Sequence, residues 1–429
     1  MQPNIPESSL PRVVIVGGGF AGLKLATKLK DTPFQVVLLD KNNFHQFQPL
    51  YYQVATSGLE PSAIAFPFRK IFQKQKNFHF RETLVKSIDP YKKILESGIG
   101  QIRYDYLVLA MGTDTNFYRI SSIEQNALPM KTVAEALRLR NVVLENFEFA
   151  LTADTKAEQD VNLDLVIVGG GPTGVELAGA LADLRNHVLP KDYPEIDFSR
   201  MNIRLVEAGP KLLAAMSEKA SRLAEEYLKK LRVEVNCGVS VREFNNEEAI
   251  LSDGRVIKTR TLIWAAGVTA NRVEGLPAES YGPGNRLAVD AYNQVNGISG
   301  IFAIGDLCFM NTDPKYPKGH PQVAQVAIQQ AKLLAGNLKR MEKKQPLKPF
   351  AYRDKGSMAT IGRNLAVVDL PYYSFGGFFA WLTWMLVHLM SIVGVKNRLI
   401  IFINWTWAYF TKDQSLRLLI RPKPRQSTS

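Results

Sequence analysis

The sequence predicts an α/β protein in which one strand–turn–helix unit occurs twice and is followed by a C-terminal region of amphipathic helices. Two loops share the pattern G-x-G-x-x-G, at residues 17–22 and 169–174. Each loop lies between a run of β-branched residues and a helix-like segment, which is the order of a strand, a tight turn and a helix. A charge-free, aromatic stretch near the C-terminal end indicates the amphipathic helices.

The composition limits the classes of function. The chain has 429 residues, of which 46% are hydrophobic and 22% charged, and this suits two or three globular domains. The two cysteines, Cys237 and Cys308, lie far apart, which excludes a disulfide framework, a C-x-x-C redox pair and a cysteine-based zinc site. The five histidines lack metal-ligand spacing, so we expect no metal. The net charge of +13 indicates nucleic acid, anionic lipid or an acidic ligand as partner.

The first glycine-rich loop predicts a site for the pyrophosphate of a dinucleotide. Gly17 allows the tight turn, Gly19 lets the backbone approach a pyrophosphate, and Gly22 lets the helix pack closely on the strand. The pyrophosphate would lie at the positive N-terminus of the helix. The next strand, residues 35–39, ends at Asp40, where the pattern requires an acid that binds the ribose.

The second loop repeats this pattern with Gly169, Gly171 and Gly174, and the strand at 202–206 ends at Glu207. Because a carboxylate repels a 2′-phosphate, Glu207 favours NADH over NADPH. Two such loops predict two Rossmann-like domains and two dinucleotides. The usual pair is a tightly held FAD and an exchanging nicotinamide.

Three later segments agree with this reading. The predicted strands at 106–112 and 262–267 end in Ala-Met-Gly and Ala-Ala-Gly, and the strand at 300–304 is followed by Gly305-Asp306. Here the chain resembles the flavoprotein reductases with two dinucleotide-binding domains, which implies that Asp306 holds the ribityl chain of FAD. The predicted domains are 10–120 (FAD-binding, first part), 121–290 (NADH-binding), 291–345 (FAD-binding, second part) and 346–429 (membrane anchoring and dimerisation).

The helix that follows carries a more specific pattern. Gln325 and Gln329 are spaced to lie on one helix face, where two amides could orient a ligand carbonyl. Together with the segments 44–55 and 352–362, this pattern resembles the type II NADH dehydrogenases, which are single-chain NADH:quinone oxidoreductases. The resemblance implies non-covalent FAD, NADH as substrate and a membrane quinone, either menaquinone or ubiquinone. It also implies a homodimer, no proton pumping, and monotopic attachment to the cytoplasmic face of a bacterial inner membrane.

The resemblance also implies roles for individual residues. Contacts to FAD are expected from Gly17, Gly19, Gly22, Asp40, Lys41, Gln48, Val85, Ala110, Gly112, Asp306 and Gln325. Contacts to NADH are expected from Gly169, Gly171, Gly174, Glu207 and Gly267. Glu176 would lie near the nicotinamide and relay protons, while Gln325, Gln329 and Lys355 would face the flavin and the quinone.

The C-terminal stretch indicates a membrane surface. No Asp, Glu, Lys or Arg occurs from Leu370 to Val395 or from Leu399 to Thr411, and four of the five tryptophans lie in these runs. One acid, Asp413, accompanies seven basic residues after position 370: Lys396, Arg398, Lys412, Arg417, Arg421, Lys423 and Arg425. Aromatic helices edged with basic residues are typical of segments that lie in a membrane interface, with the tryptophans in the interfacial belt. A buried helical hairpin or a dimer interface remains the alternative.

Three other functions stay open. A soluble NAD(P)H-dependent flavoprotein reductase with a protein acceptor would explain both loops but leave the aromatic tail without a role. A sulfide:quinone reductase would need cooperating cysteines. A nucleic-acid-binding flavoprotein, like the apoptosis-inducing factors, would spread its charge over one folded face. We expect no nucleic acid partner, because nearly half of the net charge lies beside the apolar runs.

Overall fold

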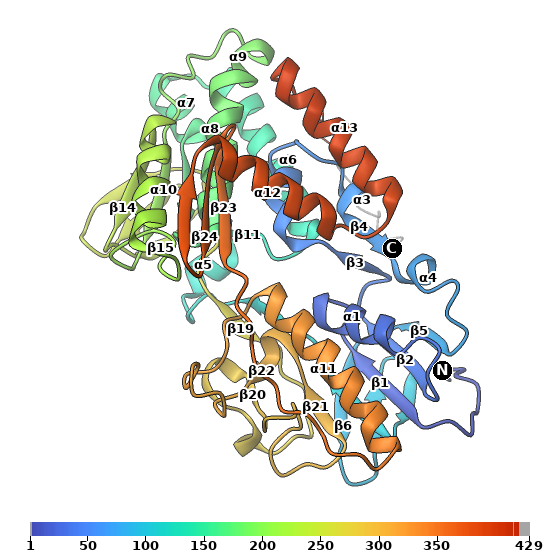
Figure 1. The fold of residues 1–429 in the computed structure, drawn as a ribbon. Helices are drawn as coiled ribbons and strands as arrows, with labels where there is room; N and C mark the ends of the chain where they lie inside the picture. The colour runs from blue at the N-terminus through green and yellow to red at the C-terminus, as the bar shows by residue number, and fades with distance from the viewer. Residues whose placement is uncertain (1, 415, 420–429) are drawn as a thin grey trace, which may run out of the picture. The chain divides into compact units, whose positions relative to one another are not determined.

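The computed structural model describes residues 2–414 and 416–419, which form two units (Figure 1). Unit 1 comprises Met1–Gln46, Ala65–Asp114 and Val268–Lys355. Unit 2 comprises Phe47–Ile64, Thr115–Gly267 and Gly356–Ser429. Both units contain a parallel sheet with helices against it, which confirms the predicted α/β class with two Rossmann-like sheets. The basic tail residues Arg421, Lys423 and Arg425 lie outside the described residues.

Unit 1 is built on a five-stranded parallel sheet. In spatial order its strands are β21 (Ile301–Ala303), β9 (Tyr106–Leu109), β1 (Arg12–Val16), β2 (Gln35–Asp40) and β5 (Phe78–Glu82). The helices α1 (Phe20–Lys28) and α11 (Ala324–Glu342) pack against each other and bury Val13 and Ile15 of β1. The shorter elements of this unit are β3 (Phe44–Gln46), β4 (Ala65–Pro67), α4 (Phe68–Ile71), β20 (Leu287–Ala288) and β22 (Cys308–Phe309).

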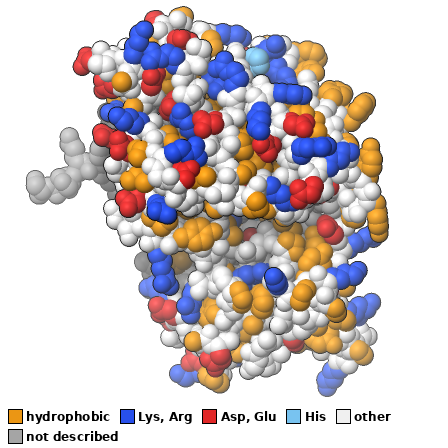
Figure 2. All heavy atoms as spheres, turned by 90° about the vertical axis from the view of Figure 1, so that its left-hand side faces the viewer, with side chains coloured by type: hydrophobic (Ala, Val, Ile, Leu, Met, Phe, Trp, Pro, Cys, Tyr) orange, Lys and Arg blue, Asp and Glu red, His pale blue; other side chains and the backbone are white. Residues whose placement is uncertain are grey.

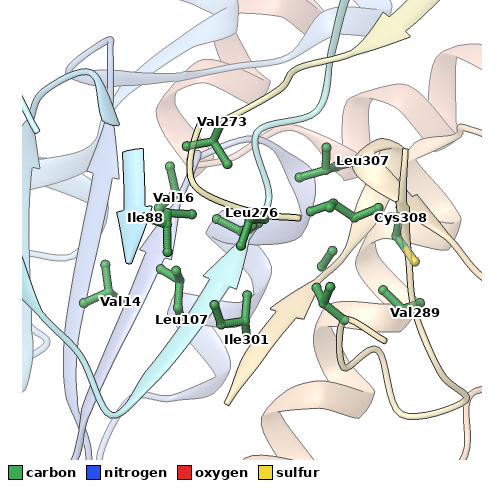
Figure 3. Packing of buried hydrophobic residues seen from close by; sticks show 14 of the residues in the cluster. Val14, Val16, Ile88, Leu107, Val273, Leu276, Val289, Ile301, Leu307 and Cys308 are labelled. Atoms are coloured by element: carbon green, nitrogen blue, oxygen red, sulfur yellow. The ribbon is translucent and has the colours of Figure 1, made fainter. Parts of the chain in front are cut away.

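The other face of this sheet carries a second apolar core. Because successive side chains of a strand point to opposite faces, Val14 and Val16 lie on this side, with Leu107 and Ile301 (Figure 3). The core is completed by the segment around Cys308 and by an antiparallel sheet of three strands. These strands are β6 (Val85–Asp89), β7 (Ile94–Ser97) and β8 (Gly100–Arg103). Because both faces of β1 are buried, every position from Val13 to Val16 is apolar, which explains the unbroken run of β-branched residues.

Unit 2 repeats the arrangement. Its parallel sheet has the order β11 (Leu128–Pro129), β18 (Thr261–Trp264), β12 (Leu165–Val168), β13 (Ile203–Glu207) and β14 (Val233–Cys237). An antiparallel sheet adds β15 (Val241–Phe244), β16 (Glu248–Leu251) and β17 (Val256–Lys258). The helices are α2 (Tyr51–Ala55), α3 (Pro61–Ile64), α5 (Ser121–Asn126), α6 (Val133–Leu151), α7 (Lys156–Leu163), α8 (Pro172–His187), α9 (Leu189–Asp192) and α10 (Glu218–Lys230).

The C-terminal region packs on α8. Three antiparallel strands, β23 (Ser357–Gly362), β24 (Leu365–Leu370) and β25 (Tyr373–Gly376), precede α12 (Phe378–Ser391) and α13 (Val395–Thr411). A Cβ at Gly179 of α8 would lie 1.7 Å from the carbonyl oxygen of Ile361, so the strand approaches closely only because residue 179 is glycine. In the described part of the chain, no helix is both long enough and apolar enough to cross a membrane.

Candidate functional site

The first glycine-rich loop has the geometry of a pyrophosphate site. Gly17 has a φ of +99°, and a Cβ there would lie 2.4 Å from the carbonyl oxygen of Ala110. A Cβ at Gly22 would lie 1.8 Å from the carbonyl oxygen of Gly17, so helix and turn touch. A Cβ at Gly19 would meet nothing within 4 Å, although this residue directly precedes α1. The open side of the loop therefore exposes the helix N-terminus, where a phosphate can approach the backbone.

The second loop, in unit 2, repeats each of these features. Gly169 has a φ of +113°, and a Cβ there would lie 2.6 Å from the carbonyl oxygen of Ala265. A Cβ at Gly174 would lie 1.9 Å from the carbonyl oxygen of Gly169, whereas a Cβ at Gly171 would meet nothing within 4 Å. α8 begins directly after this open glycine, with proline at its first position.

The predicted acids close both loops from the neighbouring strand. Gly18 N donates to Asp40 Oδ2 at 2.6 Å, and Gly170 N donates to Glu207 Oε2 at 2.5 Å. The second oxygen of Glu207 accepts a hydrogen bond from Gly209 N at 2.6 Å. Burial raises the pKa of Asp40, while its backbone hydrogen bonds act in the opposite direction. Each carboxylate is therefore fixed at the mouth of its loop, where a ribose hydroxyl can reach it.

The other predicted flavin contacts, apart from Gln48, lie in unit 1. Ala110 and Gly112 follow β9, and Asp306 follows β21, so they lie at the carboxyl edge of the same parallel sheet as the first loop. Ligands of open α/β sheets bind at this edge. Lys41 follows the acid at the end of β2 and is exposed, and Val85 begins β6.

Gln325 and Gln329 lie on one face of α11, as the spacing indicated, and both bind the extended segment that ends unit 1. Gln329 donates to the carbonyl oxygen of Arg353 at 2.9 Å and accepts from its N–H at 3.1 Å. Gln325 Oε1 accepts from Lys355 N at 3.1 Å. The two amides thus position the exposed Lys355 through its backbone. A direct role of these three residues toward a quinone stays a prediction.

Glu176 is buried on α8, with 8% of its surface exposed. Its Oε1 accepts hydrogen bonds from Trp384 Nε1 at 3.2 Å and from Thr360 N at 3.4 Å. Burial raises the pKa of Glu176 to about 8, and the two hydrogen bonds reduce that effect. At neutral pH the carboxyl group therefore holds a proton that it can release with a small change in its surroundings.

Glu176 lines two hollows of unit 2. One, of about 80 Å³, is shared with Gln48 and with Thr173 of the second loop. The other, of about 130 Å³, lies among α2, α8, the β23–β24 turn, α12 and α13. The carboxyl group thus lies between the glycine-rich loop and the C-terminal helices. Gln48 belongs to unit 2, whereas the other predicted flavin contacts belong to unit 1.

Several aromatic side chains line the larger hollow, which we call the Glu176 cavity. Trp384 packs on Trp405 with ring centroids 5.8 Å apart and stacks on His388 at 4.0 Å. Trp405 Nε1 donates to Gln53 Oε1 at 2.7 Å, which ties α13 to α2. Trp384 is 2% exposed, so its predicted place in an interfacial belt is wrong: it packs inward because its N–H has a carboxylate partner there. These aromatic residues were not among the predicted site residues, because an aromatic stretch in the sequence does not show which side chains point into the protein and which point outward.

Arg363 holds the far end of α13 against the same cavity. Its guanidinium donates to the carbonyl oxygens of Ala408 at 2.9 Å and Tyr409 at 3.1 Å. A cation at the last carbonyls of a helix satisfies them and is favoured by the helix dipole. The N-terminal half of α13 is held by Asn397, which donates to the carbonyl oxygens of Ser62 and Ala63.

The opposite sides of α12 and α13 are apolar and exposed. Phe379 is 73% exposed, Phe410 is 78% exposed and Trp407 is 64% exposed. Further exposed apolar side chains on these helices are Phe378, Leu382, Leu386, Val387, Met390, Val395, Leu399, Ile400, Phe402 and Ile403. An apolar surface of this extent marks a site of interaction with protein or membrane. We call this set the apolar face.

Comparison with known proteins places the chain among nucleotide-dependent oxidoreductases. The family model described as pyridine nucleotide-disulphide oxidoreductase matches residues 11–331, and the NDH2 C-terminal domain matches residues 355–412. The type II NADH:quinone oxidoreductase Ndh of Mycobacterium tuberculosis is 34% identical, over 96% of this chain and 90% of its own length. NdhA of the same organism is 36% identical, over 92% and 86%.

Two solved structures show the same fold. That of NDH2 from Plasmodium falciparum in complex with NADH has a TM-score of 0.87 at 22% identity, and the match covers 96% of this chain and all of that one (100%). The sulfide:quinone oxidoreductase of Aquifex aeolicus has a TM-score of 0.72 at 18% identity, covering 94% and 96%. At these identities the likeness concerns the fold.

Proposed function

The chain belongs to the type II NADH:quinone oxidoreductases, and from this premise we propose that it oxidises NADH and reduces a membrane quinone with a non-covalently bound FAD. The matches at residues 11–331 and 355–412 confirm the resemblance that the motifs indicated. The quinone would be menaquinone or ubiquinone. We further propose that the protein is a homodimer on the cytoplasmic face of a bacterial inner membrane and pumps no protons.

The observation that carries the proposal is the pair of matching loops. Each has an open glycine before a helix, two glycines in tight contact, and a carboxylate bound to the loop by its neighbouring strand. The loop in unit 1, with the carboxyl-edge residues Ala110, Gly112 and Asp306, would hold FAD. The loop in unit 2, with Glu207 and Gly267, would hold NADH.

Bound FAD supplies the hydride acceptor for NADH and the two-electron donor for the quinone. The net reaction, NADH + H⁺ + quinone → NAD⁺ + quinol, consumes one proton from the solvent in each turnover. Glu176 holds a proton that can be released near neutral pH, so it suits a general acid for the quinol oxygen. Lys355 would add a positive charge near the flavin or the quinone, as the family resemblance implies.

The apolar face supports attachment to a membrane surface. α12 and α13 carry exposed Phe, Trp, Leu and Ile side chains, and Lys396 and Lys412 are exposed beside them. Such a helix pair can lie at the boundary of headgroups and acyl chains. A shared apolar face between two copies would support the proposed homodimer. Sedimentation velocity in detergent would measure the mass of the assembly.

The alternatives have less support. Cys308 is 1% exposed and burial raises its pKa to about 11, and burial also raises the pKa of Cys237. Thiol chemistry of the sulfide:quinone type is therefore disfavoured. On the face drawn in Figure 2, the Lys and Arg side chains of the described residues are interspersed with Asp and Glu. Nucleic acid binding would favour a basic patch of one sign.

A single preparation tests the proposal. The protein purified in detergent should release FAD on denaturation, which chromatography distinguishes from FMN. With no other electron acceptor present, it should then oxidise NADH rapidly only after a menaquinone or ubiquinone analogue is added. A flavin-loaded preparation without quinone-dependent turnover would contradict the proposal, and equal rates with NADPH would contradict the assigned nucleotide preference.

A further inference from the structure

Titratable residues form a line along one face of α8. Glu176, Asp183 and His187 are separated by seven and four residues, which places them on the same side of a helix. Glu176 and Asp183 both line the Glu176 cavity, and Ala180 lines it between them. The rise along the helix between the two carboxyl residues is ~10.5 Å. His187 ends the helix and is half-buried, so the line reaches the surface of unit 2 there.

Asp183 is placed for proton exchange. Its Oδ2 accepts a hydrogen bond from Arg363 N at 3.0 Å. Burial raises the pKa of Asp183, and the hydrogen bond from Arg363 and the charges of His187 and Arg363 lower it in part. The titratable or charged groups that face the line from other elements are Tyr52 of α2, Arg363 after β23, Tyr409 of α13, Lys412 after α13 and Lys191 of α9. His388 of α12 stacks on Trp384.

The cavity between the two carboxyl groups suits water. Its volume of about 130 Å³ leaves room for several molecules, since one water occupies ~30 Å³ of liquid. Gln414 lines the cavity, and its Oε1 atom is buried without a hydrogen-bond partner among the described residues. Buried polar atoms of this kind are normally satisfied by water. Gln53, Thr56 and Arg363 add further polar side chains to the lining.

Glu176 needs such a route. Its carboxyl group is bound by Trp384 and Thr360, and only 8% of the surface of Glu176 is exposed, so after releasing a proton it has little direct contact with solvent. Each turnover nevertheless consumes one solvent proton, as the net reaction requires. A buried acid that acts repeatedly must be reprotonated through other groups or through ordered water.

We propose that Asp183 is the relay residue that takes up a proton at the His187 end of α8 and passes it through cavity water to Glu176. Glu176 gives its proton to the quinol oxygen and becomes a carboxylate. Asp183 then loses a proton and Glu176 regains one, after which Asp183 is reprotonated by solvent. No electron moves along this route, and proton number is conserved at each step. The inference rests on the proposed function, because it assigns the source of the proton in that reaction.

The variant Asp183→Asn tests the relay with little change of shape. The asparagine oxygen can still accept the hydrogen bond from Arg363 N. We expect quinone reduction to slow by ~100-fold, at the lower end of the range for proton-transfer catalysis, with the loss growing as pH rises. Reduction of ferricyanide by NADH should be unchanged, because that acceptor takes electrons without protons. Asp183→Glu or added azide should restore much of the quinone rate.

A measurement without turnover gives a second readout. The protonated carboxyl band of Glu176, identified by infrared difference against Glu176→Gln, shifts when the protein is mixed with D₂O. Asp183→Asn should slow this exchange. Glu226→Gln is the matched control, since Glu226 is exposed on α10 and pairs with Arg222.

The outcomes separate the two proposals. If wild-type protein reduces quinone but Asp183→Asn keeps its rate, pH profile and exchange rate, the relay is wrong. If the wild type reduces no quinone, the proposed function is wrong, while the D₂O exchange still tests the route. Equal losses with quinone and ferricyanide would show a general structural defect and overturn the assignment of a proton relay.

Discussion

The indole N–H of Trp384 donates a hydrogen bond to Glu176 Oε1 at 3.2 Å, although the two residues are 208 positions apart. This contact joins the C-terminal region to the helix that follows the second glycine-rich loop. It offsets part of the burial that raises the pKa of the carboxyl group to about 8. The pKa of Glu176 is therefore set by its burial on α8 and by hydrogen bonds from β23 and α12.

Replacing Trp384 by phenylalanine removes this donor and keeps an aromatic ring. Because the donor stabilises the carboxylate, the pKa of Glu176 should rise further above about 8. A hydrogen bond to a charged group contributes ~1.5–3 kcal/mol, which corresponds to ~1–2 pH units. An infrared titration of the carboxyl band measures the shift. Trp407→Phe, at a side chain 64% exposed on α13, should leave the titration unchanged; an equal shift in both variants would contradict the assignment.

Glu176 should also make stability depend on pH. Its pKa is raised from 4.5 to about 8 on folding, so between these values the folded protein holds a proton that the unfolded chain has lost. The contribution of Glu176 to the free energy of unfolding is therefore greatest below pH 4.5. It falls as the pH rises to about 8, by up to ~5 kcal/mol. Glu176→Gln should remove this decline. Denaturant unfolding at several pH values, with Glu226→Gln as control, would show it; parallel curves for wild type and Glu176→Gln would contradict the pKa.

The two glycines of the second loop should behave differently when a methyl group is added. At Gly171 the methyl group meets no protein atom within 4 Å, so Gly171→Ala should fold normally and raise the KM for NADH by ~10-fold or more. At Gly174 the methyl group would lie 1.9 Å from the carbonyl oxygen of Gly169, so Gly174→Ala should lower the Tm. Kinetics and thermal unfolding of both variants test this. A normal KM for Gly171→Ala would place the pyrophosphate elsewhere.

Glu207 should determine the choice between NADH and NADPH. Glu207→Gln removes the negative charge but retains an oxygen that can accept from Gly170 N. The preference for NADH should fall by ~10-fold or more, which equals about 1.4 kcal/mol of discrimination. The ratio of kcat/KM for the two nucleotides measures it. Glu234→Gln on the next strand, where the acid pairs with Arg204, is the control and should keep the wild-type ratio.

The apolar face should mediate membrane binding. The double variant Phe379→Glu/Phe410→Glu changes two side chains that are 73% and 78% exposed, so folding should be unaffected. Burial of each Phe side chain in the membrane would contribute ~1.5–3 kcal/mol to the free energy of binding. Binding of the double variant to lipid vesicles should therefore weaken by more than ~10-fold. Vesicle co-sedimentation measures the change, with Tyr91→Glu, 92% exposed in unit 1, as control. Undiminished binding of the double variant would exclude this face.

The glycine-rich loops could be predicted because their requirements are local. Gly17 and Gly22 are needed by the turn itself, and Asp40 follows from the length of one strand–helix–strand unit. Such constraints depend on residue type and spacing, both of which are visible in a sequence. The common face of Gln325 and Gln329 followed from helix periodicity in the same way.

The Glu176 cavity could not be predicted, because it depends on packing between distant segments. Trp384 and Trp407 lie in two neighbouring charge-free runs of similar composition, yet Trp384 is buried against a carboxyl group and Trp407 is exposed. Composition does not distinguish a tryptophan that faces lipid from one that faces a cavity. Asp183 was equally hidden, since its partner Arg363 N lies 180 positions away.

Gly179 has no side chain, yet its close contact with β23 affects the hydrogen bonding of Glu176, one turn earlier on α8. The contact of this residue with Ile361 fixes the distance between α8 and β23, and Thr360, one residue earlier on that strand, donates to Glu176. A methyl group at position 179 would force the strand away and weaken that hydrogen bond. The absence of a side chain at position 179 thus influences the pKa of Glu176, although Gly179 itself does not contact the carboxyl group.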